Sequence, residues 1–537
     1  MTSLISDDRW MASLRERLAA KLPEFLRGQR WFAGKSEAMQ SIEVWEIVPL
    51  PSDGHEVCLF FVRVNYASRK AQNYVLPLVI AATGAGKTGF PSKISALIEV
   101  GELSPPCVLW DAFYDASFAK NLLKLIEEGA DLSGSASKVS GRSRPDFEKL
   151  SQRGEGSPEP SLMRVEQSNT SVRYGERFIL KFFRRLEEGQ NLDLEMGTFL
   201  TERALFPNCP PVAGFVEYHR GTAAPATLAL LQGYVPNQGD AWHYTLQELE
   251  RHLEQFEAQL PVAEEGAKPS GGAASWIDAG IPQPARAIMG SYLENSALLG
   301  ERTAELHRAL ASDLSDPNFQ PERFTPEFQR ETSDSAIRLA ESAFELLRER
   351  LDMLPRAAHE DARRVLTLEK QIVRQFRAIR NRKISALRTR LHGDYHLGQV
   401  LYTGSDFVII DFEGEPERPL AERRVKRSPL RDVAGMLRSF HYAAQTAALR
   451  RTGEGGGARK FEVLLWRDWA STAFLSAYRE TAEGFGFLPQ ETAELIFLLD
   501  LYLLEKAVYE LIYELNNRPE WIGIPLGGIL GLVSLNP

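Results

Sequence analysis

The chain has 537 residues, more than one ordinary domain holds, so two or three domains are expected. Its 44% hydrophobic and 25% charged residues are typical of a globular protein and exclude a disordered or fibrous one. With 63 basic and 72 acidic residues the net charge is −9, which argues against a general nucleic-acid binder but not against binding of a nucleotide.

Three scattered cysteines form no CxxC pair: Cys58, Cys107 and Cys209. This usage favours reduced thiols in a cytoplasmic protein over a disulfide framework or a zinc site. The N-terminus lacks the basic start and apolar stretch of a signal peptide, and no apolar run reaches the length of a membrane span. We therefore expect a cytoplasmic protein with no membrane contact.

The first hundred or so residues predict a small α+β unit. Apolar residues at spacings of four from Trp10 to Leu26 indicate an amphipathic helix, in which Pro23 is a candidate kink. Segments 41–48, 56–66 and 73–81 are rich in β-favouring residues and predict strands.

Two stretches have the composition of insertions. Residues 129–160 are rich in Ser, Gly, Arg, Glu and Pro, which predicts a mobile surface segment with little fixed structure. Residues 261–279 are rich in Gly, Ser, Ala and Pro and predict a second insertion.

A strand with one lysine among apolar residues follows at 177–183. Kinases use such a lysine to hold the α- and β-phosphates of the nucleotide, braced by a Glu on a neighbouring helix. Lys181 is the candidate, with Glu195 as its partner and Glu202, two turns further on, as the fallback. A lone strand lysine is otherwise an exposed side chain, and the position of Lys181 upstream of the motifs below favours the functional interpretation.

Other residues of this region are candidates for holding ATP. No GxGxxG is present, so the polar turn with Ser168 and Asn169 would cover the phosphates through backbone N–H groups and hydroxyls. The strand at 227–235 predicts a hinge whose backbone, from Gln232 through Tyr234 and Val235, would bind the adenine edge. Asp240 either reaches the ribose or caps the next helix, and the sequence leaves both open.

The stretch 391–415 carries the densest chemistry. Apolar runs at 400–402 and 407–410, separated by a Thr-Gly-Ser-Asp turn, predict a hairpin. Asp394 precedes it in a His-Gly-Asp motif, Gln399 stands five residues on, and Asp411 and Glu413 follow it. Each motif alone is compatible with a turn carboxylate that caps backbone N–H groups. Their combination around one hairpin is typical of phosphoryl transfer.

The chemistry of phosphoryl transfer assigns roles to these residues. The reaction needs a carboxylate that orients the attacking hydroxyl and accepts its proton, for which Asp394 is the candidate. Gln399 and Asp411 would supply hard oxygen ligands for Mg²⁺, and Glu413 would contact a second ion. Downstream, the basic segment 417–431 lacks interleaved aromatics and predicts an activation-segment equivalent, and Asp432 would hydrogen-bond the backbone of the His-Gly-Asp loop.

The helix predicted at 501–515 presents polar and aromatic groups at spacings of three and four. Aromatic faces beside charged groups suit a sugar site, although a helix with a mixed exposed surface has the same pattern. The candidate sugar-binding residues are His396, Lys506, Tyr509, Glu510, Tyr513 and Trp521.

Three motifs carry a resemblance to a known family. QRWFAGK at 29–35, HGDYHLGQ at 392–399 followed by DFEGEP at 411–416, and KxxYExxYExxNRPxW at 506–521 resemble the maltokinases. These are bacterial sugar kinases of the aminoglycoside phosphotransferase-like branch of the protein-kinase-like fold. Without the resemblance, QRWFAGK would be interpreted as a buried aromatic corner.

The resemblance implies both an architecture and an activity. The fold would be α+β, with an N-terminal cap domain (1–105), a nucleotide-facing N-lobe (106–235, including the mobile insertion 129–160) and a helical C-lobe (236–537) of a bilobal kinase. The activity would be ATP- and Mg²⁺-dependent phosphorylation of maltose to maltose 1-phosphate, which feeds trehalose-to-glycogen synthesis. A separate trehalose synthase would then be a candidate partner.

Two rival functions remain open at this point. The same machinery could phosphorylate another acceptor such as glucosamine or an aminoglycoside, which a pocket lined by several carboxylates would favour and a cation such as Lys506 would disfavour. A non-catalytic, kinase-shaped regulator is the other rival, and intact Lys181, Asp394 and Asp411 argue against it.

Overall fold

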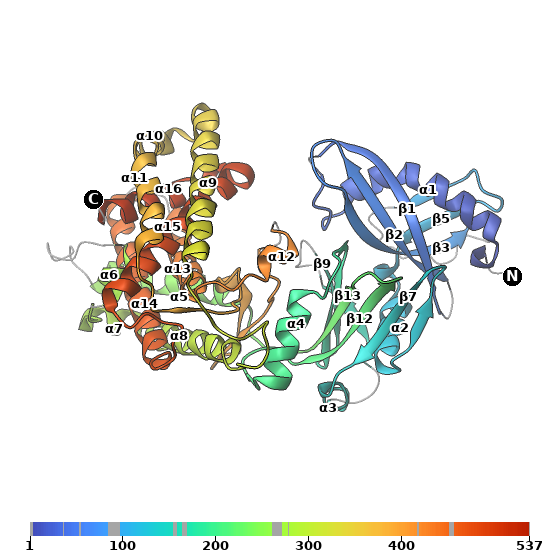
Figure 1. Cartoon of the computed structure of the whole chain (residues 1–537), viewed down its shortest axis with the longest axis horizontal. Helices are drawn as coiled ribbons and strands as arrows, with labels where there is room; N and C mark the ends of the chain where they lie inside the picture. Colours follow the sequence, from blue (N-terminus) through green and yellow to red (C-terminus); the bar gives the residue numbers. More distant parts are fainter. Residues whose placement is uncertain are drawn as a thin grey trace. The chain divides into compact units, whose positions relative to one another are not determined.

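The computed structural model describes residues 4–35, 37–52, 55–83, 97–153, 158–163, 169–259, 271–277, 279–415, 418–450 and 456–535. The chain divides into two compact units (Figure 1). The first comprises Met1–Thr201 and Pro210–Pro236, and the second comprises Glu202–Cys209 and Asn237–Pro537. Sheets dominate the first unit and helices the second.

The first sheet of the first unit is antiparallel, with strand order β1-β2-β3-β5-β4 and β11 (Arg185–Leu186) paired to β3. Helix α1 (Asp8–Gly28) covers one face, where its buried leucines pack with alternate residues of the strands, and Pro23 does not interrupt it. The strands are β1 (Met39–Leu50), β2 (Glu56–Tyr66), β3 (Gln72–Ala82), β4 (Ile98–Val100) and β5 (Cys107–Asp111). The helix and strands predicted here are confirmed, and β5 lies beyond the cap boundary predicted at residue 105.

The second sheet of this unit has seven strands in the order β6-β7-β12-β13-β10-β9-β8. It shares a hydrophobic core with the first sheet and with α2 (Ala116–Glu127). Helix α4 (Leu192–Thr198) contributes Leu194 to a smaller cluster with Phe183, Val212 and Leu230. The strands are β6 (Asp131–Ser133), β7 (Ser137–Ser143), β8 (Pro160–Leu162), β9 (Asn169–Tyr174), β10 (Phe178–Phe183), β12 (Val212–Arg220) and β13 (Ala226–Gly233).

The prediction of little fixed structure at 129–160 is wrong for most of that segment. It contains β6, β7, α3 (Asp146–Ser151) and the start of β8, while 154–157 lie outside the described residues. One of the glycines that suggested a mobile segment serves packing instead. A Cβ on Gly141 in β7 would lie 2.2 Å from the Leu125 carbonyl oxygen, so glycine lets α2 approach the strand closely.

The second unit is mostly helical, as predicted. Helix α15 packs against α9, α13 and α16, and α14 packs against α8 and α13. The helices are α5 (Ala241–Gln259), α6 (Ala273–Ile277), α7 (Gln283–Met289), α8 (Ser291–Leu310), α9 (Pro326–Arg350), α10 (His359–Thr367), α11 (Glu369–Ala378), α12 (Leu420–Arg423), α13 (Leu430–Arg450), α14 (Gly456–Thr481), α15 (Thr492–Asn517) and α16 (Gly523–Leu535).

The predicted hairpin of the second unit is confirmed. Strands β16 (Val400–Tyr402) and β17 (Phe407–Ile409) pair antiparallel, with Leu401 opposite Val408. Neighbouring backbone extends the pairing, because the Tyr402 N–H donates to the Gly239 carbonyl at 2.9 Å and the Gln238 N–H donates to the Tyr402 carbonyl at 2.8 Å.

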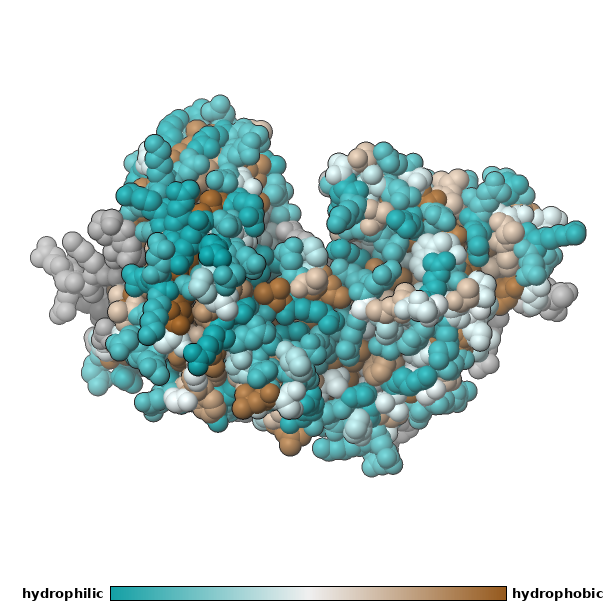
Figure 2. All heavy atoms as spheres, viewed as in Figure 1, coloured by the Kyte–Doolittle hydropathy of each residue, from teal (hydrophilic) through white to brown (hydrophobic). Residues whose placement is uncertain are grey.

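The visible surface of the chain is mainly hydrophilic, with small, separated hydrophobic spots (Figure 2). Among the described helices, none combines the length and the apolar character that crossing a membrane requires.

Candidate active site

The His-Gly-Asp loop of the second unit is fixed by a buried carboxylate. The N–H groups of His392 and Gly393 donate to the two oxygens of Asp432, at 2.7 and 3.0 Å. His307 donates to the same carboxylate at 3.2 Å and accepts from the Tyr478 hydroxyl, so His307 is a structural residue. Burial raises the pKa of Asp432, but its hydrogen bonds and the neighbouring histidines outweigh burial and leave the pKa lowered. The backbone role predicted for Asp432 is thus present.

Asp394 lies beside a half-buried lysine. The Lys506 ammonium is 3.5 Å from Asp394 Oδ1 and 3.8 Å from Glu415, and His396 Nε2 is 3.9 Å from Asp394 Oδ2. Burial raises the pKa of Asp394, yet the attraction of Lys506 outweighs it and the pKa falls below the usual value. Asp394 is therefore a carboxylate at neutral pH and able to accept a proton.

Gln399 and Asp411 meet at the open end of the hairpin, opposite its turn. Gln399 Nε2 donates to Asp411 Oδ2 at 2.8 Å, and the Ile410 N–H donates to the Gln399 carbonyl at 3.0 Å. Asp411 has a φ of +68°, a left-handed conformation that non-glycine residues rarely adopt and that clusters at functional sites.

The loops that carry Asp394 and Asp411 lie side by side. The His392 ring donates to the Ile410 carbonyl at 2.8 Å, and a Cβ on Gly393 would lie 3.2 Å from the Gly414 Cα. Both glycines have positive φ, of +90° and +70°, a conformation that glycine adopts without strain.

This donor set fits Mg²⁺, which prefers carboxylate and amide oxygens. Gln399 and Asp411 offer such oxygens next to one another. Glu413 is half-buried, and its main-chain carbonyl accepts from Arg423 at 2.9 Å.

In the first unit, Lys181 on β10 pairs with a residue that the sequence analysis missed. Its ammonium is 2.9 Å from the Asp193 carboxylate, and both side chains are buried. Asn191 caps α4 by accepting from the Asp193 N–H at 2.7 Å, which fixes the start of the helix. Glu195, the predicted partner, is buried two residues further along α4. A capping Asn followed by two acids in the first turn was the available signal, but spacing alone could not rank Asp193 against Glu195.

The predicted adenine-binding strand offers one orphan donor. Gln232 is buried on β13, and its side-chain nitrogen has no hydrogen-bond partner among the described residues. The Gly233 and Tyr234 N–H groups already donate to the Pro211 and Arg177 carbonyls, at 2.8 and 2.9 Å. A buried amide without a partner fits an adenine edge, because leaving such a donor unpaired is costly.

The remaining nucleotide candidates differ in what the structure describes. Asn169 begins β9, whereas Ser168 lies outside the described residues. The Arg173 guanidinium lies 4.3 Å from the centre of the Tyr234 ring. The contacts of adenine with Tyr234 and with the next residue, Val235, stay predictions. Asp240 caps α5, since it accepts from the His243 N–H at 2.8 Å, and its contact with a ribose stays a prediction.

The predicted sugar-binding residues fall into separate environments. Lys506 lies 4.8 Å from the centre of the Tyr509 ring, and Glu510 is buried against Arg438 with contacts of 2.5 to 3.3 Å. The Arg518 guanidinium lies 5.3 and 4.7 Å from the centres of the Tyr513 and Trp521 rings. Their roles in sugar binding stay predictions.

A small cavity lies next to the His-Gly-Asp loop. Two of its carboxylates are neutralised by arginines, because Glu505 pairs with Arg431 at 2.7 Å and Glu415 pairs with Arg418. Its lining residues are Leu339, Gly393, Tyr395, Glu415, Arg418, Arg431, Asp432, Gly435, Tyr502, Glu505, Lys506 and Tyr509.

Known proteins share both the sequence and the fold of this chain. Residues 25–115 match the maltokinase N-terminal cap domain. A glucosamine kinase of Streptacidiphilus jiangxiensis is 24% identical over 67% of this chain and 70% of its own length. The glucosamine kinase of Mycolicibacterium smegmatis is 26% identical over 69% and 78%. The chain is a maltokinase-like protein.

Solved structures agree on the fold of this maltokinase-like chain. A glucosamine kinase in complex with glucosamine, ADP and inorganic phosphate has a TM-score of 0.59 at 20% identity, covering 97% of this chain and 99% of that one. A second crystal form of a glucosamine kinase has a TM-score of 0.60 at 19% identity, covering 97% and 100%. The predicted kinase-like fold with an N-terminal cap domain is confirmed, and the sequence relatives support phosphotransferase activity.

Proposed function

We propose that the chain is an ATP-dependent sugar kinase that phosphorylates maltose at its anomeric hydroxyl, giving maltose 1-phosphate. The observation that carries the proposal is the ionised Asp394 beside Lys506, at a small cavity and on a loop adjoining Asp411.

Each residue would act by positioning and by its charge. Asp394 would orient the acceptor hydroxyl and take its proton as the oxygen attacks the γ-phosphorus, with ADP as the leaving group. Lys506 would keep Asp394 ionised before the attack. Lys181, aligned by Asp193, would hold the nucleotide phosphates, and the orphan amide of Gln232 would meet the adenine.

The metal would be held by Gln399 and Asp411. Bound Mg²⁺ neutralises phosphate charge during transfer. The hydrogen bond from the Gln399 amide nitrogen to Asp411 holds the two side chains next to one another. No phosphoenzyme is needed, because the acceptor oxygen itself attacks the phosphorus.

The charges at the cavity favour a neutral acceptor over an amine-bearing one. Glu415 and Glu505 are each paired with an arginine, and Lys506 lies 3.5 Å from Asp394 and 3.8 Å from Glu415. A protonated amino sugar would bring a positive charge that finds no unpaired carboxylate among the described lining residues. Maltose is neutral and meets no such cost.

Glucosamine is the competing acceptor, since the sequence relatives are named glucosamine kinases. A non-catalytic regulator is the less favoured alternative, because Lys181, Asp394 and Asp411 are all intact. For the maltose kinase we further propose a cytoplasmic role in supplying α-glucan synthesis, with a separate trehalose synthase as the source of maltose.

The test is ADP release with ATP and Mg²⁺ against maltose, glucose, trehalose, glucosamine and kanamycin. Turnover of maltose, with the phosphate at the reducing-end position, supports the proposal. A preference for glucosamine or kanamycin would show that maltose is the wrong acceptor, while the proposal of a kinase activity would stand. Nucleotide binding without turnover of any sugar would favour the regulator.

A further inference from the structure

The second unit contains a short segment that comes from the middle of the first unit's sequence. Residues Glu202–Cys209 begin within the π-helical turn Phe199–Arg203 that follows α4, and they precede β12. Asn208 in this segment is 7% exposed. Its side-chain amide is therefore buried, although Asn208 is far in sequence from the hairpin of β16 and β17.

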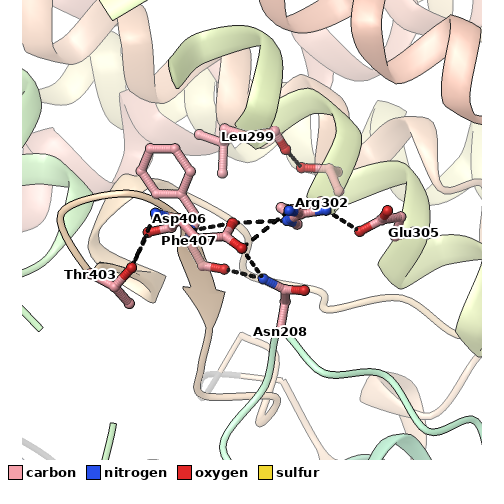
Figure 3. Close-up of polar contacts among 8 residues, drawn as sticks. Asn208, Leu299, Arg302, Glu305, Thr403, Asp406 and Phe407 are labelled. Atoms are coloured by element: carbon pink, nitrogen blue, oxygen red, sulfur yellow. Dashed lines mark hydrogen bonds and ion pairs between the residues drawn. The ribbon is translucent and has the colours of Figure 1, made fainter. Parts of the chain in front are cut away.

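Asn208 extends the hairpin on its β17 side. Its carbonyl accepts from the Ile409 N–H at 2.8 Å, and its side-chain nitrogen donates to the Phe407 carbonyl at 2.8 Å and to Asp406 Oδ2 at 3.2 Å (Figure 3). One residue therefore satisfies a donor and an acceptor of β17 two positions apart. On the opposite side, β16 is paired with Gln238 and Gly239.

Arg302 on α8 holds the turn of the same hairpin. It forms a bidentate pair with Asp406, with Nε–Oδ1 at 2.8 Å and Nη2–Oδ2 at 3.1 Å, and its Nη1 contacts Glu305 at 2.8 Å (Figure 3). Asp406 also accepts from the Phe407 N–H at 2.7 Å. Such fork-shaped pairs restrain geometry more strictly than a single contact does.

The restrained strand leads straight into the metal-binding pair. Asn208 fixes Ile409, the Gln399 carbonyl accepts from Ile410, and the next residue is Asp411 with its left-handed φ. A backbone conformation of this kind persists where the surroundings over-determine it. A shift of β17 would move Asp411 and release its hydrogen bond to Gln399.

We propose that Asn208 and Arg302 are positioning residues that hold β17 in register, so that Asp411 and Gln399 keep the geometry that a divalent cation requires. The inference rests on the proposed function for the metal–nucleotide complex. The inference assigns a role to two residues, Asn208 and Arg302, that lie outside the motifs at 392–399 and 411–416.

The test compares Asn208→Ala, Arg302→Met and Arg302→Lys with the full-length wild type. The matched control is Arg203→Met, which removes ion pairs from the same segment to Asp313 and Asp316, two residues outside the hairpin. Mn²⁺ affinity in the presence of ADP, followed by electron paramagnetic resonance, gives a readout that does not depend on turnover. The Mg²⁺ concentration for half-maximal activity, kcat and Tm are measured in parallel.

We expect Asn208→Ala and Arg302→Met to weaken Mn²⁺ binding about 10-fold or more, as changes to groups that orient metal ligands do. Arg302→Lys should fall between them and the wild type, because lysine keeps the charge and loses the fork. Arg203→Met should bind Mn²⁺ as the wild type does.

Unchanged Mn²⁺ affinity in Asn208→Ala and Arg302→Met, with only a lower Tm, would overturn the inference. A wild type that binds no Mn²⁺ with ADP would overturn it as well. A wild type that binds Mn²⁺ but phosphorylates no sugar would refute the proposed function, while weaker binding in the variants would still support the positioning role.

Discussion

Asp394 owes its low pKa to one partner above the others. Burial alone would raise the pKa of this carboxyl, and Lys506 at 3.5 Å reverses that effect. The pKa of Lys506 is in turn raised, because Asp394 and Glu415 outweigh the lowering effect of burial. The pair therefore stays charged at neutral pH.

Replacing Lys506 by Met should make the enzyme more sensitive to acid. Only ionised Asp394 accepts the proton, so activity falls as the pH drops through its pKa. Without Lys506, burial raises that pKa, and the acid limb of the kcat/KM profile should move to higher pH. Lys506→Arg keeps the charge and should keep the limb near its wild-type position. An unshifted limb in Lys506→Met would mean that another group sets the pH dependence.

Asp394→Asn should remove turnover and spare nucleotide binding. The amide cannot take the proton of the acceptor hydroxyl, so kcat should fall by about 10²–10⁴-fold. Calorimetric titration with ADP, together with ADP-release kinetics, measures both properties. Full activity in this variant would remove Asp394 from the role of base.

At the scale of elements, α13 and α15 are tied by a buried ion pair, Arg438 with Glu510. Removing one partner of such a pair leaves an uncompensated buried charge, at a cost of about 3–5 kcal/mol. Glu510→Ala should therefore lower the free energy of unfolding by about that amount, while the double variant Arg438→Met/Glu510→Met should recover much of it. Denaturant unfolding measures the effect. A raised KM for sugar with unchanged stability would instead make Glu510 a sugar ligand.

Sequence reasoning succeeded where a pattern is local. The hairpin, β10 with Lys181 and the helix of Lys506 follow from runs of a few residues, and all are present. It failed at β7, where Gly141 lets α2 approach closely, a requirement visible only in three dimensions. The contact of Lys181 with Asp193 escaped for a related reason, since Asp193 and Glu195 occupy one helical turn, and the pairing with Glu195 stays a prediction.

At the scale of the whole molecule, the first unit joins two sheets over one core. Residues of the first sheet such as Phe61 and Trp110 share that core with Tyr218 and Leu228 of the second. The cap region is therefore not an independent appendage, although the sequence suggested a boundary at residue 105.

Deleting residues 1–105 should prevent the remainder of the first unit from folding. The deletion leaves β5 without its neighbours β3 and β4 and exposes the shared apolar core to water. Hydrogen exchange should show loss of protection in β10 and β13 of the truncated chain. Protection equal to that of the full chain would contradict a shared core.

The acceptor is the central claim, and a competition assay tests it most directly. The full chain is given ATP, Mg²⁺ and equal concentrations of maltose and glucosamine, with Asp394→Asn as the blank. Products are then identified by mass spectrometry and phosphorus NMR. The account predicts phosphorylated maltose with its phosphate on the anomeric carbon. Glucosamine phosphate as the main product would contradict the assignment of a neutral acceptor.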